Sequence, residues 1–488
     1  MTARRKPREG LPKLRLRRDA PPPAKGTLRV LPVAAGAPVP QPHAAAASAA
    51  RFTGREGQVL ALPDLVLVGA GAARAAQDFW VCGGTAWPTV SQARHVVLDA
   101  RGLSADHAAA LAAGLHLRAW DGARHRSGDR PEPPESLTLL VDDTVAAKPR
   151  WREAHAAVRG TLFARDLVAD PGNHLTPSIF AERLGALTKH GIEVEILTPK
   201  QLAKKRFGAL LAVGGGSAHP PCLVVLRWAG RIAAPPVAFV GKGICFDTGG
   251  ISIKPAAGME EMTADMAGAA ACAGAMLTLA LRESPAPAIA VLPLAENAIG
   301  AGAYRPGDVL RTLSGRTVEV LDTDAEGRLV LADALHYAAT RFAPQAIVDL
   351  ATLTGSIIIA LGHHRAGIFA SDPPLSAFCV AAGEEVGERL WPMPIAEQYR
   401  KDLDSDIADI RQCAPSGSGA WGGRLLPDAC HAAAFLREFA EGVPWAHLDI
   451  AGVETRSGAD ALGPKGASGF GVRLLDALVK LRFEDEDR

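Results

Sequence analysis

Three acidic residues spaced two apart, Asp322, Asp324 and Glu326, are the clearest chemical signal in this sequence. They follow a mostly apolar stretch at 318–321 and precede an apolar stretch that begins at Leu329. On an extended backbone, alternate side chains project from one face, so the three carboxylates converge. Because like charges in one site repel, burying them without a cation would be costly. A solvated acidic turn is the alternative, but the apolar flanks favour a cation site.

Two further segments place charged residues where a strand is expected to end. In residues 239–255, the only charges are Lys242, Asp247 and Lys254, among glycines that allow the backbone to approach a bound group closely. This segment lacks the G-x-x-x-x-G-K-[ST] pattern of a phosphate-binding loop. Asp265 opens a predicted helix of small apolar residues. Each segment alone also fits an ordinary strand–loop junction or an acid favoured by the helix dipole.

Together the segments supply four carboxylates and two lysines on loops beside strand ends, where open α/β sheets place ligand sites. The carboxylates are Asp247, Asp265, Asp324 and Glu326. Such sites suit hard or borderline divalent ions, and bridging carboxylates hold two ions roughly 3.5–4 Å apart. Two ions of this kind activate a shared water and polarise a carbonyl. The residues by themselves predict a dinuclear metal hydrolase and do not name its substrate.

The elements that must position these residues alternate between strands and helices. In the C-terminal part we expect strands at 194–197, 223–228, 237–240, 288–292 and 346–350, and helices at 177–190, 265–282 and 329–342. Residues 58–143 predict a smaller unit, with strands at 59–62 and 65–68 and a helix at 104–117. The predicted fold class is therefore α/β: a smaller N-terminal α/β domain, and a larger C-terminal α/β catalytic domain with a mixed central sheet.

Composition along the chain sets the predicted domain boundaries. Residues 1–50 hold ten Lys or Arg residues and nine prolines against two acids, which predicts a disordered basic extension. We favour a solvated extension over an arm that touches nucleic acid or a protein partner. The N-terminal domain is predicted at 51–145, a linker helix at 146–170 and the catalytic domain at 171–488.

The composition of the whole chain is that of a soluble globular protein. The chain has 488 residues, of which 48% are hydrophobic and 22% charged, with a formal net charge of +1. This balance gives no argument for nucleic acid or a membrane as partner. No apolar run approaches the roughly 18 residues that span a bilayer. Seven scattered cysteines without a C-x-x-C pair are typical of reduced thiols, which favours a cytoplasmic location.

Several longer stretches, in one order along the chain, resemble the leucine aminopeptidase (cytosol aminopeptidase) family. The family signature Asn-Thr-Asp-Ala-Glu-Gly-Arg-Leu is similar to residues 322–329. Further matches lie at 164–168, 173–177, 292–297, 304–308, 349–355 and 445–452, so the resemblance covers about residues 160–480. It implies an enzyme that removes single residues from the N-terminus of peptides. It also implies a homohexamer of two-domain subunits, with catalysis in the C-terminal domain.

The resemblance implies a role for each metal-binding residue. Asp247 and Glu326 would bridge two divalent ions, zinc or manganese. Lys242 and Asp265 would complete the ligands of one ion, and Asp324 those of the other. Ligation by Lys242 requires a neutral amine, so its pKa must fall well below the ordinary value of ~10.4.

The resemblance also implies two catalytic residues, Lys254 and Arg328. Lys254 would hold or polarise the scissile carbonyl. Arg328 begins a helix, where amide N–H groups and a cation together make an anion site. This fits the bicarbonate ion that serves the family as general base. The free amine of the substrate would bind one metal ion, which explains why only terminal residues are removed.

The chain departs from the family pattern beside these residues. Asp322 stands where the family usually has Asn, and we expect its charge to tune the metal ions without abolishing their binding. Thr263-Ala264 replaces the usual Lys and aromatic residue before Asp265, so packing or substrate access there differs.

A third departure concerns the pocket for the first side chain of the substrate, predicted from Met262, Ala451 and Glu454. The family lines this pocket with small or apolar residues. An inward Glu454 would favour an N-terminal Lys or Arg, or a small polar residue, over Leu. The alternative is that Glu454 points to solvent or pairs with Arg456, which leaves an ordinary preference for Leu and Met.

Two other classes of function are open from the sequence. A DNA-binding regulatory protein would use the basic residues 1–50, but the rest of the chain shows no basic stripe or reading motif. A catalytically inactive structural relative would have no need for the full set of charged ligands.

Overall fold

The computed structural model of the chain describes residues 11–22, 24–127, 132–415 and 427–485. It divides into two units. The first runs to Val158 and includes Arg456–Gly466, and the second holds Arg159–Thr455 and the residues from Ala467 onward. We describe each unit by itself.

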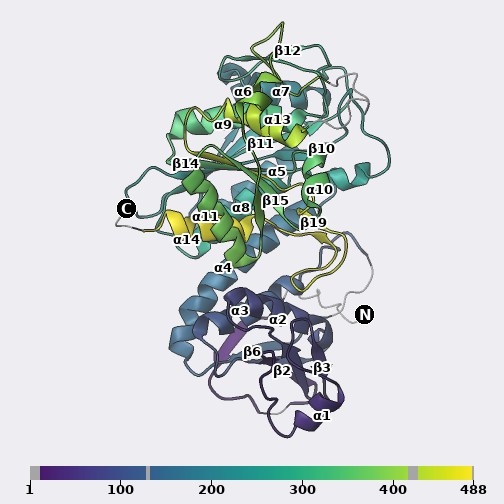
Figure 1. Ribbon diagram of the computed structural model, residues 1–488, viewed down its shortest axis with the longest axis vertical. Coiled ribbons are helices and arrows are strands. Elements are labelled where there is room, and N and C mark those ends of the chain that lie inside the picture. The colour runs from purple at the N-terminus through teal and green to yellow at the C-terminus, as the bar shows by residue number, and fades with distance from the viewer. Residues whose placement is uncertain (1–10, 23, 128–131, 416–426, 486–488) are drawn as a thin grey trace, which may run out of the picture. The chain divides into compact units, whose positions relative to one another are not determined.

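The first unit is built on a six-stranded sheet with the strand order β1-β6-β5-β2-β4-β3 (Figure 1). Its strands are β1 (Leu14–Arg17), β2 (Thr27–Val33), β3 (Val59–Ala61), β4 (Leu65–Gly69), β5 (His95–Asp99) and β6 (Ser136–Leu140). All neighbouring strands are parallel except the β3–β4 pair. The helices are α1 (Ala44–Ala49), α2 (Ala76–Val90) and α3 (Ala105–Arg118). The last two pack closely because Gly83 lacks a Cβ, which would otherwise lie 1.8 Å from the carbonyl oxygen of Leu111.

The prediction of a disordered extension at residues 1–50 is wrong for the described part of that segment. It supplies β1, β2 and α1, and β2 lies between β4 and β5 in the middle of the sheet. Val30 of β2 is fully buried, whereas Arg15 and Arg17 of β1 point outward. Average composition hid this pattern, because the arginines occupy the exposed positions of strands whose other positions are apolar. Residues 1–10 lie outside the described residues.

The predicted linker helix is a single helix, α4 (Thr144–Val168), of 25 residues. The boundary between the two units, at Val158, falls inside this helix. The first unit therefore begins before residue 51 and extends past residue 145, where the sequence placed the ends of the N-terminal domain.

The second unit contains a nine-stranded sheet with the order β16-β15-β18-β14-β9-β11-β8-β7, in which β10 also pairs with β11. The strands are β7 (Glu193–Leu197), β8 (Cys222–Trp228), β9 (Val237–Gly241), β10 (Gly243–Asp247), β11 (Ala288–Asn297), β14 (Ala346–Ala351), β15 (Ala366–Ala370), β16 (Leu390–Pro392) and β18 (Trp445–Asp449). Strands β18, β14, β9 and β11 are parallel, and antiparallel pairs join β7, β8 and β15 to them. The predicted α/β class with a mixed central sheet is confirmed.

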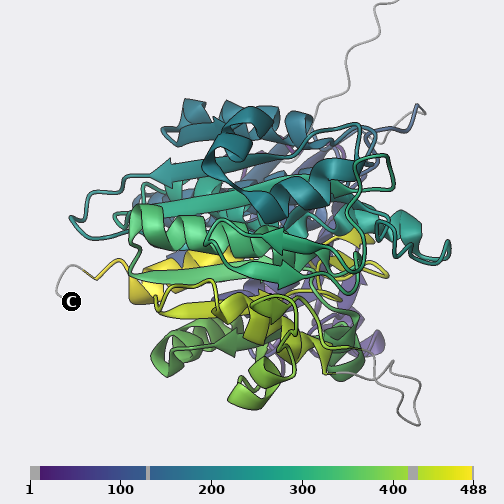
Figure 2. The ribbon, with the colours of Figure 1, turned by 90° about the horizontal axis from the view of Figure 1, so that it is seen from above.

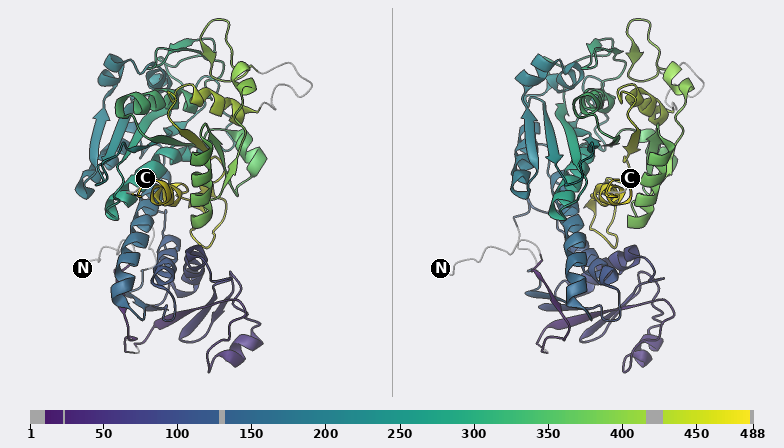
Figure 3. Two further views of the ribbon diagram at one scale, coloured as in Figure 1. Left: turned by 60° about the vertical axis from the view of Figure 1, so that its left-hand side comes forward. Right: turned by 90° about the vertical axis from the view of Figure 1, so that its left-hand side faces the viewer.

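Helices lie on both faces of this sheet (Figures 2 and 3). The helices that follow α4 in this unit are α5 (Pro177–Gly185), α6 (Pro199–Lys205), α7 (Gly208–Val213), α8 (Ala267–Leu281), α9 (Glu326–Phe342), α10 (Gly355–Leu361), α11 (Pro373–Val386), α12 (Glu397–Lys401), α13 (Asp428–Arg437) and α14 (Val472–Arg482). A small second sheet joins β12 (Val309–Arg311), β13 (Thr317–Glu319) and β17 (Ile410–Arg411). On β9, Ala238 and Val240 belong to the same buried cluster as Leu329 and Leu335 of α9.

The region of α8 differs from two expectations. The stretch Met259–Leu281 is long and apolar enough to cross a membrane by length and composition, although 94% of its most apolar window is buried inside the protein. Such burial is typical of the core helix of a globular unit. Asp265 does not open α8, because Met259–Ala264 form a short 3-10 helix (η3) and α8 begins at Ala267. Asp265 therefore lies at the bend between the two helices.

Candidate metal centre

The carboxyl ends of β9 and β10 and the start of α9 bring the predicted charged residues together. Lys242 follows β9, Asp247 ends β10, and Glu326 is the first residue of α9. Gly327 allows α9 to approach this closely, since a Cβ there would lie 2.6 Å from Cε of Lys242. One ligand oxygen from each of Asp247, Asp265 and Glu326 lies within 4.8 Å of the others.

The inner half of the site surrounds Lys242. Its Nζ lies 2.8 Å from Oδ1 of Asp265 and 2.8 Å from Oε1 of Glu326. It also donates a hydrogen bond of 3.0 Å to the carbonyl oxygen of Thr352, whose hydroxyl donates to Asp265 at 2.7 Å. Oδ2 of Asp265 and Oε2 of Glu326 are buried, and neither has a hydrogen-bond partner within the described parts of the chain. Buried carboxylate oxygens without partners are costly, so these two atoms indicate a missing ligand.

The outer half of the site surrounds Lys254. Its Nζ lies 2.8 Å from Oδ2 of Asp247 and 2.5 Å from Oδ1 of Asp324. The side chains of Lys254 and Asp324 are 19% and 34% exposed, so this half is open to solvent while the inner half is buried.

Burial and the crowding of the acids raise the pKa values of three of them. Burial, with the charges of Glu326 and Asp247, raises the pKa of Asp265 well above its ordinary value. Burial and the nearby Asp247 also raise the pKa of Glu326. For Asp324 the same two causes raise the pKa to about 7. The acids thus compete for the available positive charge, and a divalent cation would relieve them.

The pKa values of the two lysines are also raised, which for a lysine favours the charged form. Burial by itself lowers the pKa of Lys242, but Asp265 and Glu326 outweigh it and the pKa is raised. Asp247 and Asp324 likewise overcome the effect of burial and raise the pKa of Lys254. With the acids alone as partners, Lys242 is therefore an ammonium, contrary to the low pKa that ligation of a metal ion requires.

Arg328 is buried in the first turn of α9, as predicted. Its Nη1 donates to the carbonyl oxygen of Gln412 at 3.0 Å, and its Nη2 pairs with Oδ1 of Asp428 at 2.9 Å. Its Nε is buried and has no hydrogen-bond partner in the described ranges. A buried guanidinium with an unused donor is suited to binding a small anion.

Glu454 does not point to solvent. Its Oε2 is buried without a hydrogen-bond partner among the residues described, and burial raises the pKa of its carboxyl group. Arg456, the partner considered for it, instead pairs with Asp460 at 2.6 Å. Of the other two predicted pocket residues, Ala451 is buried and Met262 is half-buried in η3. The side chain of Glu454 as a whole is half-buried, with one oxygen enclosed, and it forms no ion pair with Arg456 among the described residues.

Neutral side chains that the sequence left without a role hold the loops of the site. Asn297 donates from Nδ2 to Oδ1 of Asp247 at 2.8 Å and to the carbonyl oxygen of Thr323 at 2.9 Å. The hydroxyl of Tyr304 donates to the same carbonyl at 2.8 Å. Both residues fall in stretches that resemble the family, at 292–297 and 304–308, which was the only signal for them. Asp322 stays outside the ligand set, and its Oδ1 accepts a hydrogen bond from the backbone N–H of Asp324 at 2.9 Å.

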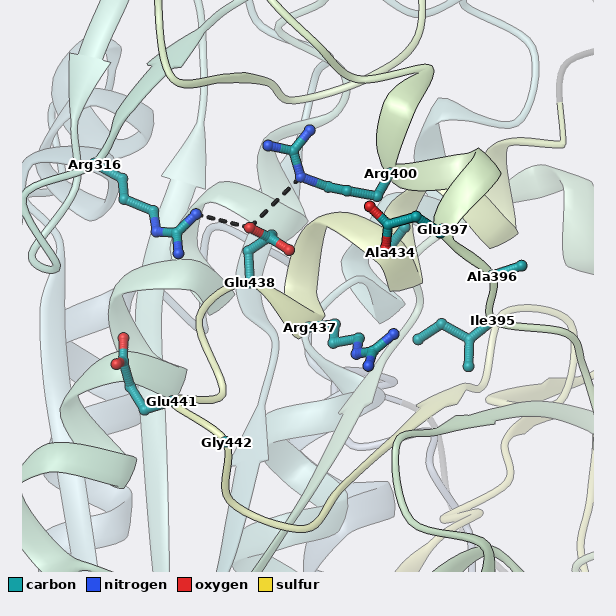
Figure 4. A pocket seen from close by; sticks show the side chains of 10 residues that line it. All are labelled: Arg316, Ile395, Ala396, Glu397, Arg400, Ala434, Arg437, Glu438, Glu441 and Gly442. Carbon is teal, nitrogen blue, oxygen red and sulfur yellow. Dashed lines mark hydrogen bonds and ion pairs between the residues drawn. The ribbon is translucent and has the colours of Figure 1, made fainter.

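A cavity of about 390 Å³ lies outside this centre, and none of its lining residues is a predicted site residue (Figure 4). It is lined partly by Arg316, Arg400, Arg437 and Glu438. Glu438 pairs with Arg316 at 2.7 Å and with Arg400 at 3.5 Å. The charges of this cavity largely neutralise one another, so it lacks the excess of acids that marks the metal centre.

A mixed sheet covered by helices, with buried carboxylates crowded at the carboxyl ends of its strands, fits an α/β metal-dependent enzyme. Residues 162–476 match the model of the cytosol aminopeptidase family, catalytic domain. The chain belongs to this family, and it is a metal-dependent aminopeptidase of the leucine aminopeptidase type.

Individual relatives agree with this assignment. A probable cytosol aminopeptidase of Rhizobium meliloti is 43% identical, over 95% of this chain and 97% of the relative. One of Brucella melitensis is 44% identical, over 86% and 87%. Among solved structures, the bottromycin maturation enzyme BotP in complex with Mn is 35% identical, with a TM-score of 0.84 over 94% of this chain and 99% of that one. A mutant of tomato leucine aminopeptidase is 32% identical, with a TM-score of 0.84 over 97% and 98%. Divalent metal binding follows from the family and from the acid cluster.

Proposed function

We propose that Lys242, Asp247, Asp265, Asp324 and Glu326 bind two divalent ions, zinc or manganese. The observation that carries this proposal is the pair of buried, partnerless oxygens on Asp265 and Glu326, in a cluster whose acids have raised pKa values. The donor set fits, because carboxylates suit both ions. When bound, two such ions supply an activated water and a Lewis acid for the peptide carbonyl.

The position of each acid supports its proposed role. Asp247 faces Lys254 through one oxygen and still lies within 4.8 Å of the ligand oxygens of Asp265 and Glu326. It therefore reaches both halves of the site and would serve, with Glu326, as a ligand shared by the two ions. Asp265 belongs to the inner half and Asp324 to the outer half. Lys242 joins the inner ligands only after losing its proton, which a metal ion among the same acids would displace.

Lys254 and Arg328 then act on the substrate and on the proton of the attacking water. The raised pKa of Lys254 keeps it an ammonium. Its partial exposure lets it donate a hydrogen bond to the oxygen of the scissile carbonyl, where negative charge develops. Arg328 would hold a bicarbonate ion through its Nε, a buried donor without a partner among the described residues, and the bicarbonate would supply the general base.

The test is an activity screen over aminoacyl amides with protein stripped of metal and then supplied with zinc, manganese or magnesium. We expect no turnover in the stripped protein and recovery with zinc or manganese at two ions per chain. Full turnover in a rigorously metal-free preparation would refute the proposal.

We also propose that Glu454, with Met262 and Ala451, selects the first residue of the substrate and favours Lys or Arg. Glu454 keeps Oε2 buried without a partner, and a Leu side chain beside it would leave this acid unpaired at a cost of a few kcal/mol. A cationic side chain would recover much of that cost.

The measurement for this pocket is kcat/KM for Leu, Met, Arg and Lys substrates in wild type and in Glu454→Ala. We expect the substitution to move preference from basic toward apolar substrates by roughly tenfold, about 1.4 kcal/mol. Unchanged ratios would show that Glu454 takes no part in selection.

We further propose a homohexamer acting on peptides in the cytoplasm. The name of the family and the seven free cysteines support the location, because reduced thiols are usual there. Light scattering would distinguish a hexamer from smaller assemblies. Nucleic acid binding through the basic N-terminal residues has no comparable support, and a salt-dependent gel shift would test it.

A further inference from the structure

Gln412 follows β17 and is fully buried beside the loop that leads to the metal ligands. Strand β17 is parallel to β13, with Ile410 opposite Val318 and Arg411 opposite Glu319. The backbone N–H of Gln412 continues this pairing by donating to the carbonyl oxygen of Glu319 at 3.1 Å. The pairing of β17 with β13 thus places the side chain of Gln412 beside the chain segment that follows β13.

The side-chain amide of Gln412 makes four hydrogen bonds to the backbone of that segment. Its Oε1 accepts from the N–H groups of Leu321 and Asp322, at 2.8 and 3.4 Å. Its Nε2 donates to the carbonyl oxygens of Asp322 and Ala325, at 2.7 and 3.2 Å. A primary amide has two donors and two acceptor positions, so its whole capacity is used. These bonds bracket Asp324 and end next to Glu326.

The backbone of the same residue holds the catalytic arginine. The carbonyl oxygen of Gln412 accepts the hydrogen bond from Nη1 of Arg328. One residue therefore contacts both the loop that carries Asp324 and Glu326 and the guanidinium proposed to bind the general base.

We propose that Gln412 is a positioning residue. It fixes the loop that carries Asp324 and Glu326 in place relative to Arg328. This inference rests on the roles proposed above for Asp324, Glu326 and Arg328. Because Gln412 is fully buried, water cannot easily replace its amide, and removing it would take a hydrogen bond from each of four backbone groups. Of these, the carbonyl oxygen of Asp322 would keep the bond that it accepts from the N–H of Ala325. The loop would then shift to find other partners, and the ligands would shift with it. Residues that orient metal ligands in this way typically contribute about 10- to 100-fold to metal affinity or turnover.

The experiment compares Gln412→Met with Gln412→Glu. Methionine keeps the approximate shape and the backbone carbonyl but loses all four side-chain bonds. Glutamate keeps the two acceptor bonds and loses the donors to Asp322 and Ala325. Manganese affinity of the stripped protein is measured by chelator competition, and kcat and KM are measured on the metal-saturated, folded fraction. We expect Gln412→Met to weaken manganese binding and to lower kcat, each by about 10- to 100-fold, with KM within about threefold.

Asp333→Asn is the matched control. Asp333 is also fully buried, lies on α9, and accepts hydrogen bonds from the N–H groups of Ala209, Leu210 and Leu313 at 3.1, 3.0 and 2.7 Å. It touches no proposed ligand, so we expect a lower Tm with unchanged kcat and manganese affinity. Where Gln412→Met does not fold, Gln412→Glu carries the test.

Wild-type kcat and manganese affinity in a folded Gln412 variant would overturn the inference. So would a loss of kcat in Asp333→Asn of the same size, because the role of Gln412 would then be structural only. Glu326→Ala separates the two proposals. If Glu326→Ala is inactive while the Gln412 variants keep wild-type kcat and manganese affinity, only the positioning role of Gln412 is refuted. If Glu326→Ala is active, the proposed metal site is refuted, and the positioning role with it.

Discussion

Both sheets of the molecule carry acids at the carboxyl ends of their strands, but these acids have different surroundings. In the first unit, Asp99 ends β5 and pairs with Arg29 at 2.6 Å and with Arg101 at 2.7 Å. Asp142, just after β6, accepts a hydrogen bond from the N–H of Gly102 at 2.7 Å. In the second unit, four acids share two lysines, so two negative charges are in excess.

The pKa values follow this balance of charge. Burial by itself raises the pKa of Asp99, but the hydrogen bonds from Arg101 and the charge of Arg29 outweigh it, and the pKa is lowered. Burial raises the pKa values of Asp265 and Glu326, and the contact that each acid makes with Lys242 does not outweigh this effect. An acid at a strand end is therefore not by itself a sign of function. A buried excess of acids over cations indicates a site that needs a further cation.

Removal of residues 1–50 should have the largest effect, because it tests whether the first sheet is a complete structural element. The truncation deletes β1 and the central strand β2, and it leaves the edges of β4 and β5 that pair with β2 without hydrogen-bond partners. We expect an insoluble protein, or one in which hydrogen exchange shows the first unit to be unfolded. Deleting only residues 1–10 is the control. A soluble truncation at residue 50 with native exchange in β4 and β5 would contradict the described sheet.

Replacing an acid proposed to bridge the two ions should have the next largest effect, and it should change activity without changing the fold. Asp247→Ala or Glu326→Ala removes a ligand, and we expect turnover to fall by more than about 100-fold, since residues that only orient ligands already contribute up to that amount. The Tm of the metal-free protein should not fall, because removing one acid relieves repulsion among the others. A strong loss of Tm in the metal-free variants would show that these acids serve the fold.

Arg328→Ala should lower turnover by about tenfold or more while two metal ions still bind. Arg328 contacts Gln412 and Asp428 and no metal ligand, so metal content should not change. Added bicarbonate should restore turnover only in part. Wild-type turnover of this variant in bicarbonate-depleted buffer would remove the role proposed for Arg328.

The smallest effect expected is a difference in the pH dependence of stability between the two units. The lowered pKa of Asp99 gives stability that is present above its unfolded pKa and is lost as the pH falls through its folded pKa. Asp324, with a pKa raised to about 7, gives the metal-free second unit stability that is lost as the pH rises from about 4 to about 7.

Hydrogen exchange of metal-stripped protein between pH 4.5 and 7.5, corrected for intrinsic rates, would measure the two units separately. We expect the second unit to lose protection as the pH rises and the first unit to keep it. Manganese should abolish the loss, and Asp99→Asn should weaken the first unit alone. Equal pH slopes in both units would contradict the comparison.

Local pattern predicted five strands and three helices of the second unit, all of them before residue 352, and none of the elements that follow. Strands were expected at 237–240 and 346–350, and the structure has them at Val237–Gly241 and Ala346–Ala351. Their runs of apolar residues are long because both faces of the sheet are covered, and the charged residues stand out directly after them. The spacing of Asp322, Asp324 and Glu326 was therefore enough to indicate a cation site before any resemblance was considered.

Residues 11–50 show where local pattern was not enough. Their strands are short and rich in Arg and Pro, so composition indicated disorder, while pairing with β5, β4 and β6 supplies the stability that the segment lacks alone. The same reason explains Gln412, Asn297 and Tyr304, whose roles depend on backbone groups far away in the chain. The sequence by itself determined the fold class of the second unit and the set of charged residues that gather at its strand ends, because those depend on residue type and spacing. Only the tertiary structure decided which half of the site is buried, which way Glu454 points and what holds the loops, because these depend on contacts between distant segments.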